Sequence, residues 1–173
     1  MLSFLSVAVL AVAPLALATG VLPKQIKNLV TFGDSYTDVV NVADGGTAWP
    51  VYAAGYSGVS LFPFAKSGAT CSNNLTPRPF PSLYESQLPD YFNEVGNGTL
   101  KLDPTETIYT LWLGTNDVGV NSIISGGNNA SIVDVTTCLV NWVNILYARG
   151  ARNFLFQNVC FLQLIRSSLV QAC

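Results

Sequence analysis

The chain of 173 residues is half apolar, only 10% of its residues are charged, and its formal net charge is −2. This length suits one domain with its own hydrophobic core, and so few charges exclude long disordered or polyelectrolyte segments. With a slightly negative net charge, the protein has no basic face that could bind the phosphates of a nucleic acid, so nucleic-acid binding is excluded as a function class.

The N-terminal segment 1–18 has the features of a secretory signal peptide. It carries no charged side chain, its apolar run is short for a membrane span, and Ala16-Leu17-Ala18 matches the small-x-small pattern that signal peptidase cleaves. The alternative is a retained anchor, because no Lys or Arg precedes the run whereas Lys24 and Lys27 follow it. We expect residues 19–173 to form a secreted, extracellular protein without stable membrane insertion.

Sequons and cysteines agree with an extracellular protein. Candidate N-glycosylation sites are Asn74, Asn97 and Asn129, each in an Asn-x-Ser/Thr sequon. The four cysteines show no C-x-x-C spacing and the sequence has no histidine, which argues against a zinc site. In an oxidising compartment Cys71 and Cys138 are candidates for a disulfide, and two buried free thiols are the alternative.

Short apolar runs that end in turn residues predict strands, and apolar residues at helical spacing predict helices between them. In chain order the sequence predicts a strand at 28–32, at most a helical turn at 49–54, a strand at 59–64, a helix at 81–95, a strand at 107–113, a helix at 131–148 and a strand at 153–159. Pro89 either kinks the helix at 81–95 or splits it in two. One side of the helix at 131–148 carries six apolar residues, namely Ile132, Val135, Leu139, Trp142, Ile145 and Leu146. Strands that are apolar throughout and alternate with helices predict one α/β domain, a parallel sheet covered on both faces.

Residues suited to acyl transfer follow three of these strands. Ser35 follows the first strand, Gly68 the second and Asn116 the third. Ligands of an open parallel sheet bind beyond the carboxyl ends of the strands, where the strand order reverses, so a flavodoxin-like order of 2-1-3-4 brings all three to one crevice. There a serine hydroxyl attacks a carbonyl, while a glycine N–H and an amide side chain donate to the developing oxyanion. The N–H of Ser35, near an expected helix start, is a further donor.

Three sequence blocks resemble those of the GDSL, or SGNH, hydrolases. They are Phe32-Gly33-Asp34-Ser35-Tyr36-Thr37-Asp38, then Lys66-Ser67-Gly68-Ala69, then Gly114-Thr115-Asn116-Asp117. Together with Trp49-Pro50, they make residues 28–159 similar to the fungal secreted acetylesterases of carbohydrate esterase family 16.

The resemblance implies that Ser35 is the nucleophile and that Gly68 and Asn116 complete the oxyanion hole. It also implies a five-stranded parallel sheet between helices, and neither a metal nor an organic cofactor. The family ends in an Asp-x-x-His block that activates the serine, but this sequence has no histidine and residues 160–173 do not resemble that block. We therefore expect an SGNH domain that is truncated and incomplete at the C-terminal edge of the sheet. A splicing, frameshift or gene-model error would account for its atypical tail.

The leading prediction is a carboxylic ester hydrolase that works through a serine acyl-enzyme. Its substrate would be an acetylated carbohydrate or another small acetyl ester. This chain is expected to be inactive for want of a histidine base, and Lys66 is the alternative base. Two alternatives stay open. One is a non-catalytic secreted protein that binds carbohydrate or a partner through the same crevice, and the other is a non-functional fragment.

Overall fold

A four-stranded parallel sheet forms the centre of the computed structural model, which describes residues 20–42, 44–119, 122 and 130–158. Its strands are β1 (Asn28–Gly33), β2 (Ser60–Pro63), β3 (Thr107–Trp112) and β4 (Asn153–Gln157). The order in the sheet is β2-β1-β3-β4, which confirms the flavodoxin-like order expected from the sequence. Each predicted strand is present, with its ends shifted by no more than two residues.

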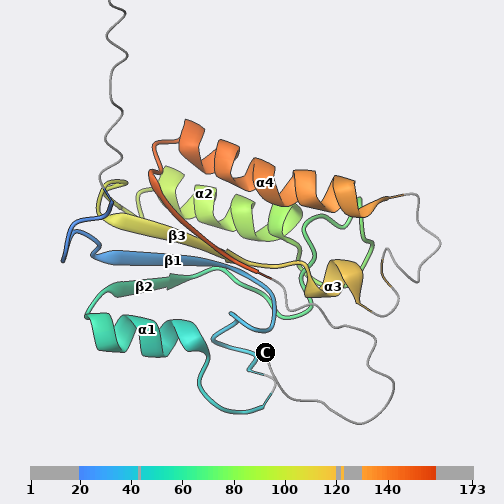
Figure 1. Ribbon diagram of the computed structural model, residues 1–173, viewed down its shortest axis with the longest axis horizontal. Coiled ribbons are helices and arrows are strands. Elements are labelled where there is room, and N and C mark those ends of the chain that lie inside the picture. Colours follow the sequence, from blue (N-terminus) through green and yellow to red (C-terminus); the bar gives the residue numbers. More distant parts are fainter. Residues whose placement is uncertain (1–19, 43, 120–121, 123–129, 159–173) are drawn as a thin grey trace, which may run out of the picture.

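Helices cover both faces of the sheet (Figure 1). They are α1 (Trp49–Ser57), the π-helical turn η1 (Leu83–Gln87), α2 (Leu88–Gly96), α3 (Thr115–Val118) and α4 (Ile132–Ala148). Figure 1 shows α2 and α4 side by side on one face, α1 on the other, and α3 at the carboxyl ends of the strands. This arrangement confirms the α/β fold class. In the part of the chain that the structure describes, no helix combines the length and the apolar character needed to cross a membrane.

The longest helix, α4, begins where the sequence predicts. The Ser131 side chain accepts from the Asp134 N–H and the Asp134 carboxylate accepts from the Ser131 N–H, which makes a capping box. Trp142 and others of its apolar side are buried, but Ile132 is 56% exposed, contrary to the expectation that it faces the core. The first turn of α4 extends past the core, and its neighbouring residues are exposed too.

Two other helical segments depart from simple periodicity. The helix α1 is nine residues long, where the sequence predicted a single turn at most, and that prediction is wrong. It lacks a continuous apolar side, but Pro50 in its first turn and the left-handed Gly58 after its last define both ends. Between 81 and 95 the helical residues run without a break, because the π-helical turn η1 passes directly into α2 at Leu88, with Pro89 in the first turn of α2.

The core lies between the sheet and the pair α2–α4. Val30 and Phe32 point to the same face of β1, and their partners on β3, Tyr109 and Leu111, point to that face as well. The Phe32 ring packs edge-on against the Trp142 ring of α4, with centroids 5.8 Å apart. Because these side chains are buried, the carboxyl ends of β1 and β3 rest on a close-packed layer.

Candidate active site

The carboxyl ends of three neighbouring strands form the candidate site. In the register of the sheet, Gly33 at the end of β1 pairs with Trp112 of β3, and Thr31 of β1 pairs with Pro63 of β2. Ser35 follows β1 directly, and the loops that carry Gly68 and Asn116 leave the strands on either side. Ser35 therefore lies between the two loops that the sequence assigns to the oxyanion hole.

Hydrogen bonds join these two loops to each other. Asn116 Nδ2 donates to the carbonyl oxygen of Ala69, the residue after Gly68, at 2.9 Å. The carboxylate of Asp117 accepts from the Cys71 N–H at 3.1 and 3.2 Å and from Thr76 Oγ1 at 3.1 Å. The loops after β2 and β3 are thus fixed to one another across the end of β1.

A tight turn after β1 presents Ser35. Gly33 has a φ of 152°, and a Cβ there would lie 2.4 Å from the Trp112 carbonyl oxygen, so only glycine fits. The Asp34 N–H donates to that same carbonyl at 3.2 Å, which keeps the turn against β3.

The segment after Ser35 is a single turn and not the helix start that the sequence suggested. The N–H groups of Thr37 and Asp38 both donate to the Asp34 carbonyl at 3.0 Å. The Asp38 carboxylate then accepts from the N–H groups of Val40 and Asn41, so the helical hydrogen bonds do not continue. The Ser35 N–H consequently lacks the support of a helix dipole that we expected.

Ser35 itself is half-buried. Its hydroxyl has no hydrogen-bond partner among the residues that the structure describes. Beside it, the Tyr36 ring is 47% exposed and stacks on the Trp112 ring, with centroids 5.2 Å apart and an interplanar angle of 12°. The serine therefore stands next to a flat aromatic surface.

Gly68 occupies a position where any side chain would be strained. Its φ is 79°, in the left-handed region, and a Cβ would lie 2.6 to 2.9 Å from three atoms of the Phe80 ring. The Phe80 ring is 42% exposed and lies over this glycine.

Three buried aspartates surround the site, and their electrostatics differ. Burial raises the pKa of Asp34 to about 6, and the nearby charge of Asp117 adds to this effect. Burial likewise raises the pKa of Asp117 to about 6, in spite of the hydrogen bonds from Cys71 and Thr76 that favour its ionised form. Burial acts in the same direction on Asp38, but N–H groups of neighbouring residues donate to its carboxylate and hold its pKa below the ordinary value.

All three carboxylates accept hydrogen bonds from N–H groups of nearby residues or of the neighbouring loop. Within residues 20–42, 44–119, 122 and 130–158, no three His, Cys, Asp or Glu side chains lie close enough together to hold a metal ion.

Sequence reasoning missed two residues that contact the site. The Gln87 side chain is fully buried; its Nε2 donates to the Gly33 carbonyl at 2.8 Å and its Oε1 accepts from the Gly33 N–H at 3.1 Å. Arg78 Nη1 lies 3.3 Å from both the carbonyl oxygen and Oδ1 of Asn116. Of these two residues, only Gln87 could have been found from the sequence. It is a polar residue four positions after Leu83, so it falls on the apolar side of the predicted helix.

A disulfide between Cys71 and Cys138 ties the loop after β2 to α4, with an S–S distance of 1.97 Å and a Cα–Cα distance of 6.3 Å. Asn74 and Asn97 are exposed, whereas the hydroxyl of Thr76, in the sequon of Asn74, is buried on Asp117. Asn129 and the predicted segments 1–18 and 160–173 lie outside the described residues.

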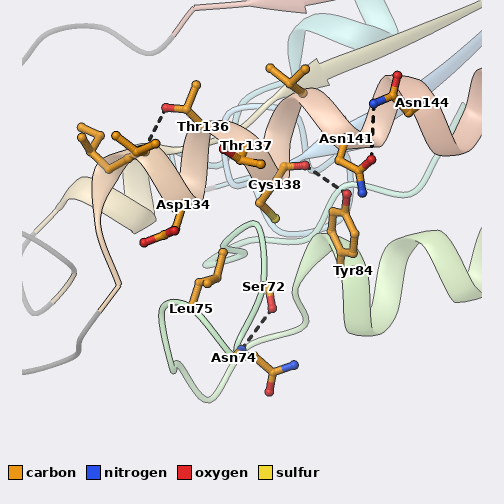
Figure 2. Close-up of a pocket in the computed structure, with 13 residues that line it drawn as sticks. Ser72, Asn74, Leu75, Tyr84, Asp134, Thr136, Thr137, Cys138, Asn141 and Asn144 are labelled. Carbon is orange, nitrogen blue, oxygen red and sulfur yellow. Dashed lines mark hydrogen bonds between the residues drawn. The ribbon is translucent and has the colours of Figure 1, made fainter.

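A groove of about 760 Å³ lies elsewhere, between α4 and the loop around Asn74 (Figure 2). Figure 2 shows Tyr84 between this loop and α4, where its hydroxyl donates to the Cys138 carbonyl at 3.0 Å. None of the three predicted site residues lines the groove. The candidate active site is therefore the cluster of residues at the strand ends and not this groove.

The fold and the three blocks agree with comparison to known families. The family model described as GDSL-like Lipase/Acylhydrolase matches residues 29–158, the stretch from β1 to the end of β4. The chain belongs to this family of hydrolases that act on ester bonds. It is also similar to an acetylesterase of Hypocrea jecorina, with 31% identity over an alignment that covers 81% of this chain and 50% of that protein. The chain thus spans about half the length of the curated relative that it matches.

Proposed function

We propose that this chain carries the nucleophile and the oxyanion hole of a secreted serine acetylesterase. The observation that carries the proposal is the hydrogen bond from Asn116 Nδ2 to the Ala69 carbonyl, because it joins the two assigned donor loops, which follow the strands on either side of β1. Acyl transfer requires a nucleophile and, close to it, groups that stabilise the oxyanion that forms on the carbonyl oxygen.

In the proposed reaction, Ser35 Oγ attacks the ester carbonyl carbon and the carbonyl π electrons move to its oxygen. The N–H of Gly68 and one N–H of Asn116 Nδ2 donate to this oxyanion. A carboxamide nitrogen has two N–H groups. Ala69 accepts one of them, which leaves the second for the substrate. Collapse of the tetrahedral intermediate re-forms the carbonyl and breaks the bond to the alcohol oxygen, which takes a proton from solvent or from the protonated base. Water then hydrolyses the acyl-serine to the free acid.

A general base must take the proton of Ser35, and the 173 residues contain no histidine. We propose that these residues by themselves react slowly, at the level that binding and an oxyanion hole sustain without a triad, roughly 10³- to 10⁴-fold above water. Among the described residues neither carboxylate is hydrogen-bonded to the Ser35 hydroxyl: Asp34 Oδ1 accepts from the Tyr36 N–H, and Asp117 accepts from Cys71 and Thr76, so we do not assign them this role.

Acetyl is the proposed acyl group, because the relative from Hypocrea jecorina is an acetylesterase. For the alcohol we propose a carbohydrate, in line with the resemblance to carbohydrate esterase family 16. The exposed ring of Tyr36, stacked on Trp112 beside Ser35, offers a flat surface on which a sugar ring can pack. The disulfide and the exposed sequon residues Asn74 and Asn97 support secretion and glycosylation.

The test is acetylation of Ser35 in the 173-residue chain with imidazole in solution as the base. p-Nitrophenyl acetate should release nitrophenolate in an imidazole-dependent reaction and leave the mass of one acetyl group on the peptide that contains Ser35. Ser35→Ala should abolish both signals, whereas Ser57→Ala, at the exposed end of α1, should change neither.

Nitrophenolate release that is equal in wild type and Ser35→Ala would overturn the esterase assignment. A folded chain that binds acetylated oligosaccharide but never becomes acetylated would instead support the non-catalytic binding protein, the alternative that the missing histidine favours.

A further inference from the structure

Arg78 contacts both sides of the proposed oxyanion hole. Its Nη1 lies 3.3 Å from the main-chain oxygen of Asn116 and 3.3 Å from Oδ1 of the same residue. Its guanidinium carbon lies 5.5 Å from the centre of the Phe80 ring, which itself covers Gly68. Arg78 is half-buried, and its guanidinium packs against Asn116 and Phe80.

These contacts select one orientation of the Asn116 carboxamide. A guanidinium only donates hydrogen bonds and a main-chain carbonyl only accepts them. With Oδ1 towards Arg78 and Nδ2 towards the Ala69 carbonyl, both contacts are hydrogen bonds. A flip of the carboxamide would place Nδ2 against a donor and Oδ1 against an acceptor, so both contacts would become repulsive.

We propose that Arg78 is a positioning residue that aims the second N–H of Asn116 Nδ2 at the substrate carbonyl. The inference rests on the proposed function, because the aimed N–H matters only if an oxyanion forms there. Arg78 acts through Asn116 and is not assigned a contact with the substrate. A single nitrogen makes both of its contacts, so a lysine ammonium can replace it, unlike at sites where the two-pronged guanidinium is needed.

The first experiment reads the orientation of Asn116 without any need for activity. In a ¹H–¹⁵N spectrum of the full chain, the side-chain amide of Asn116 is identified by its loss in Asn116→Ala. We expect the two amide proton signals to be sharp and at the same chemical shifts in wild type and in Arg78→Lys, and both signals to shift and broaden through exchange between the two carboxamide orientations in Arg78→Ala. Unchanged Asn116 signals in Arg78→Ala would overturn the proposal.

Arg149→Ala is the matched control for this spectrum. Arg149 also lies over an aromatic ring, 4.0 Å from the centre of Phe92, but at the far end of α4. Its replacement should leave the Asn116 signals as in wild type. If Arg149→Ala perturbs them as much as Arg78→Ala does, the effect reports general loosening of the fold and the proposal fails.

The second experiment measures acetylation of Ser35 by p-nitrophenyl acetate with imidazole. Asn116→Ala should slow it by about 10²- to 10³-fold, the usual cost of an oxyanion donor, and Arg78→Ala by about tenfold, with recovery in Arg78→Lys. Because Arg78 acts through Asn116, the double variant should be no slower than Asn116→Ala, whereas additive losses would contradict positioning. If wild type is never acetylated at Ser35, the proposed function fails, and the spectrum alone still decides whether Arg78 orients the carboxamide.

Discussion

Replacement of Asp34 by asparagine should make the protein's stability less sensitive to pH. The carboxyl is fully buried; its Oδ1 accepts from the Tyr36 N–H at 3.1 Å, and its Oδ2 has no partner among the residues described. Burial raises its pKa from 3.8 to about 6. An asparagine keeps the acceptor and removes the ionisation.

The sign and size follow from proton linkage. Below pH 3.8 the carboxyl is protonated in both the folded and the unfolded state, so the folded state bears no ionisation cost. As the pH rises through about 6, the folded state must ionise a buried group, and stability falls. A pKa higher by about 2 in the folded state corresponds to a loss of up to about 3 kcal/mol, at about 1.4 kcal/mol for each pKa unit.

Urea unfolding followed by tryptophan fluorescence measures this effect, since Trp142 is fully buried in the folded state. Wild type should lose stability relative to Asp34→Asn as the pH rises. The difference in free energy of unfolding, Asp34→Asn minus wild type, should therefore grow by up to about 3 kcal/mol between pH 4 and pH 7. Asp44→Asn is the matched control, because the exposed Asp44 makes the same contact with the N–H two residues on. A difference for Asp34→Asn that stays constant with pH would refute the reasoning.

Two further predictions concern the loop after β2. Gly68→Ala should destabilise the protein by about 1–3 kcal/mol more than Gly58→Ala, because both glycines are left-handed but only the Cβ at 68 meets the Phe80 ring. Equal losses in urea unfolding would mean that this ring moves aside freely. Cys138→Ala should lower the free energy of unfolding by about 4 kcal/mol, since the disulfide to Cys71 closes a sequence separation of 67 residues. Reduction of the disulfide in wild type should lower the free energy of unfolding by the same amount. If Cys138→Ala is as stable as oxidised wild type, the disulfide is not formed.

The central strands β1 and β3 were predictable because strands buried on both faces of a parallel sheet need runs that are apolar throughout. Such runs, interrupted by turn residues, are visible in the sequence around β1 and β3. The helix α1 was not predictable in its length, because it buries only Pro50 and Ala54 and leaves no apolar period to detect. Its ends depend on a proline and a left-handed glycine, which are also common in plain turns.

The sequence by itself determined which residue types follow each strand, and hence that a serine, a glycine and an asparagine come to the same edge of the sheet. Only the tertiary structure decided how that edge is held together. Gln87 reaches Gly33 across 54 positions, and Arg78 reaches Asn116 across 38. The physical reason is that a hydrogen bond depends on the distance and direction between two groups. For residues far apart in the chain, the folded sheet sets that distance and direction, and the spacing of residues along the sequence does not.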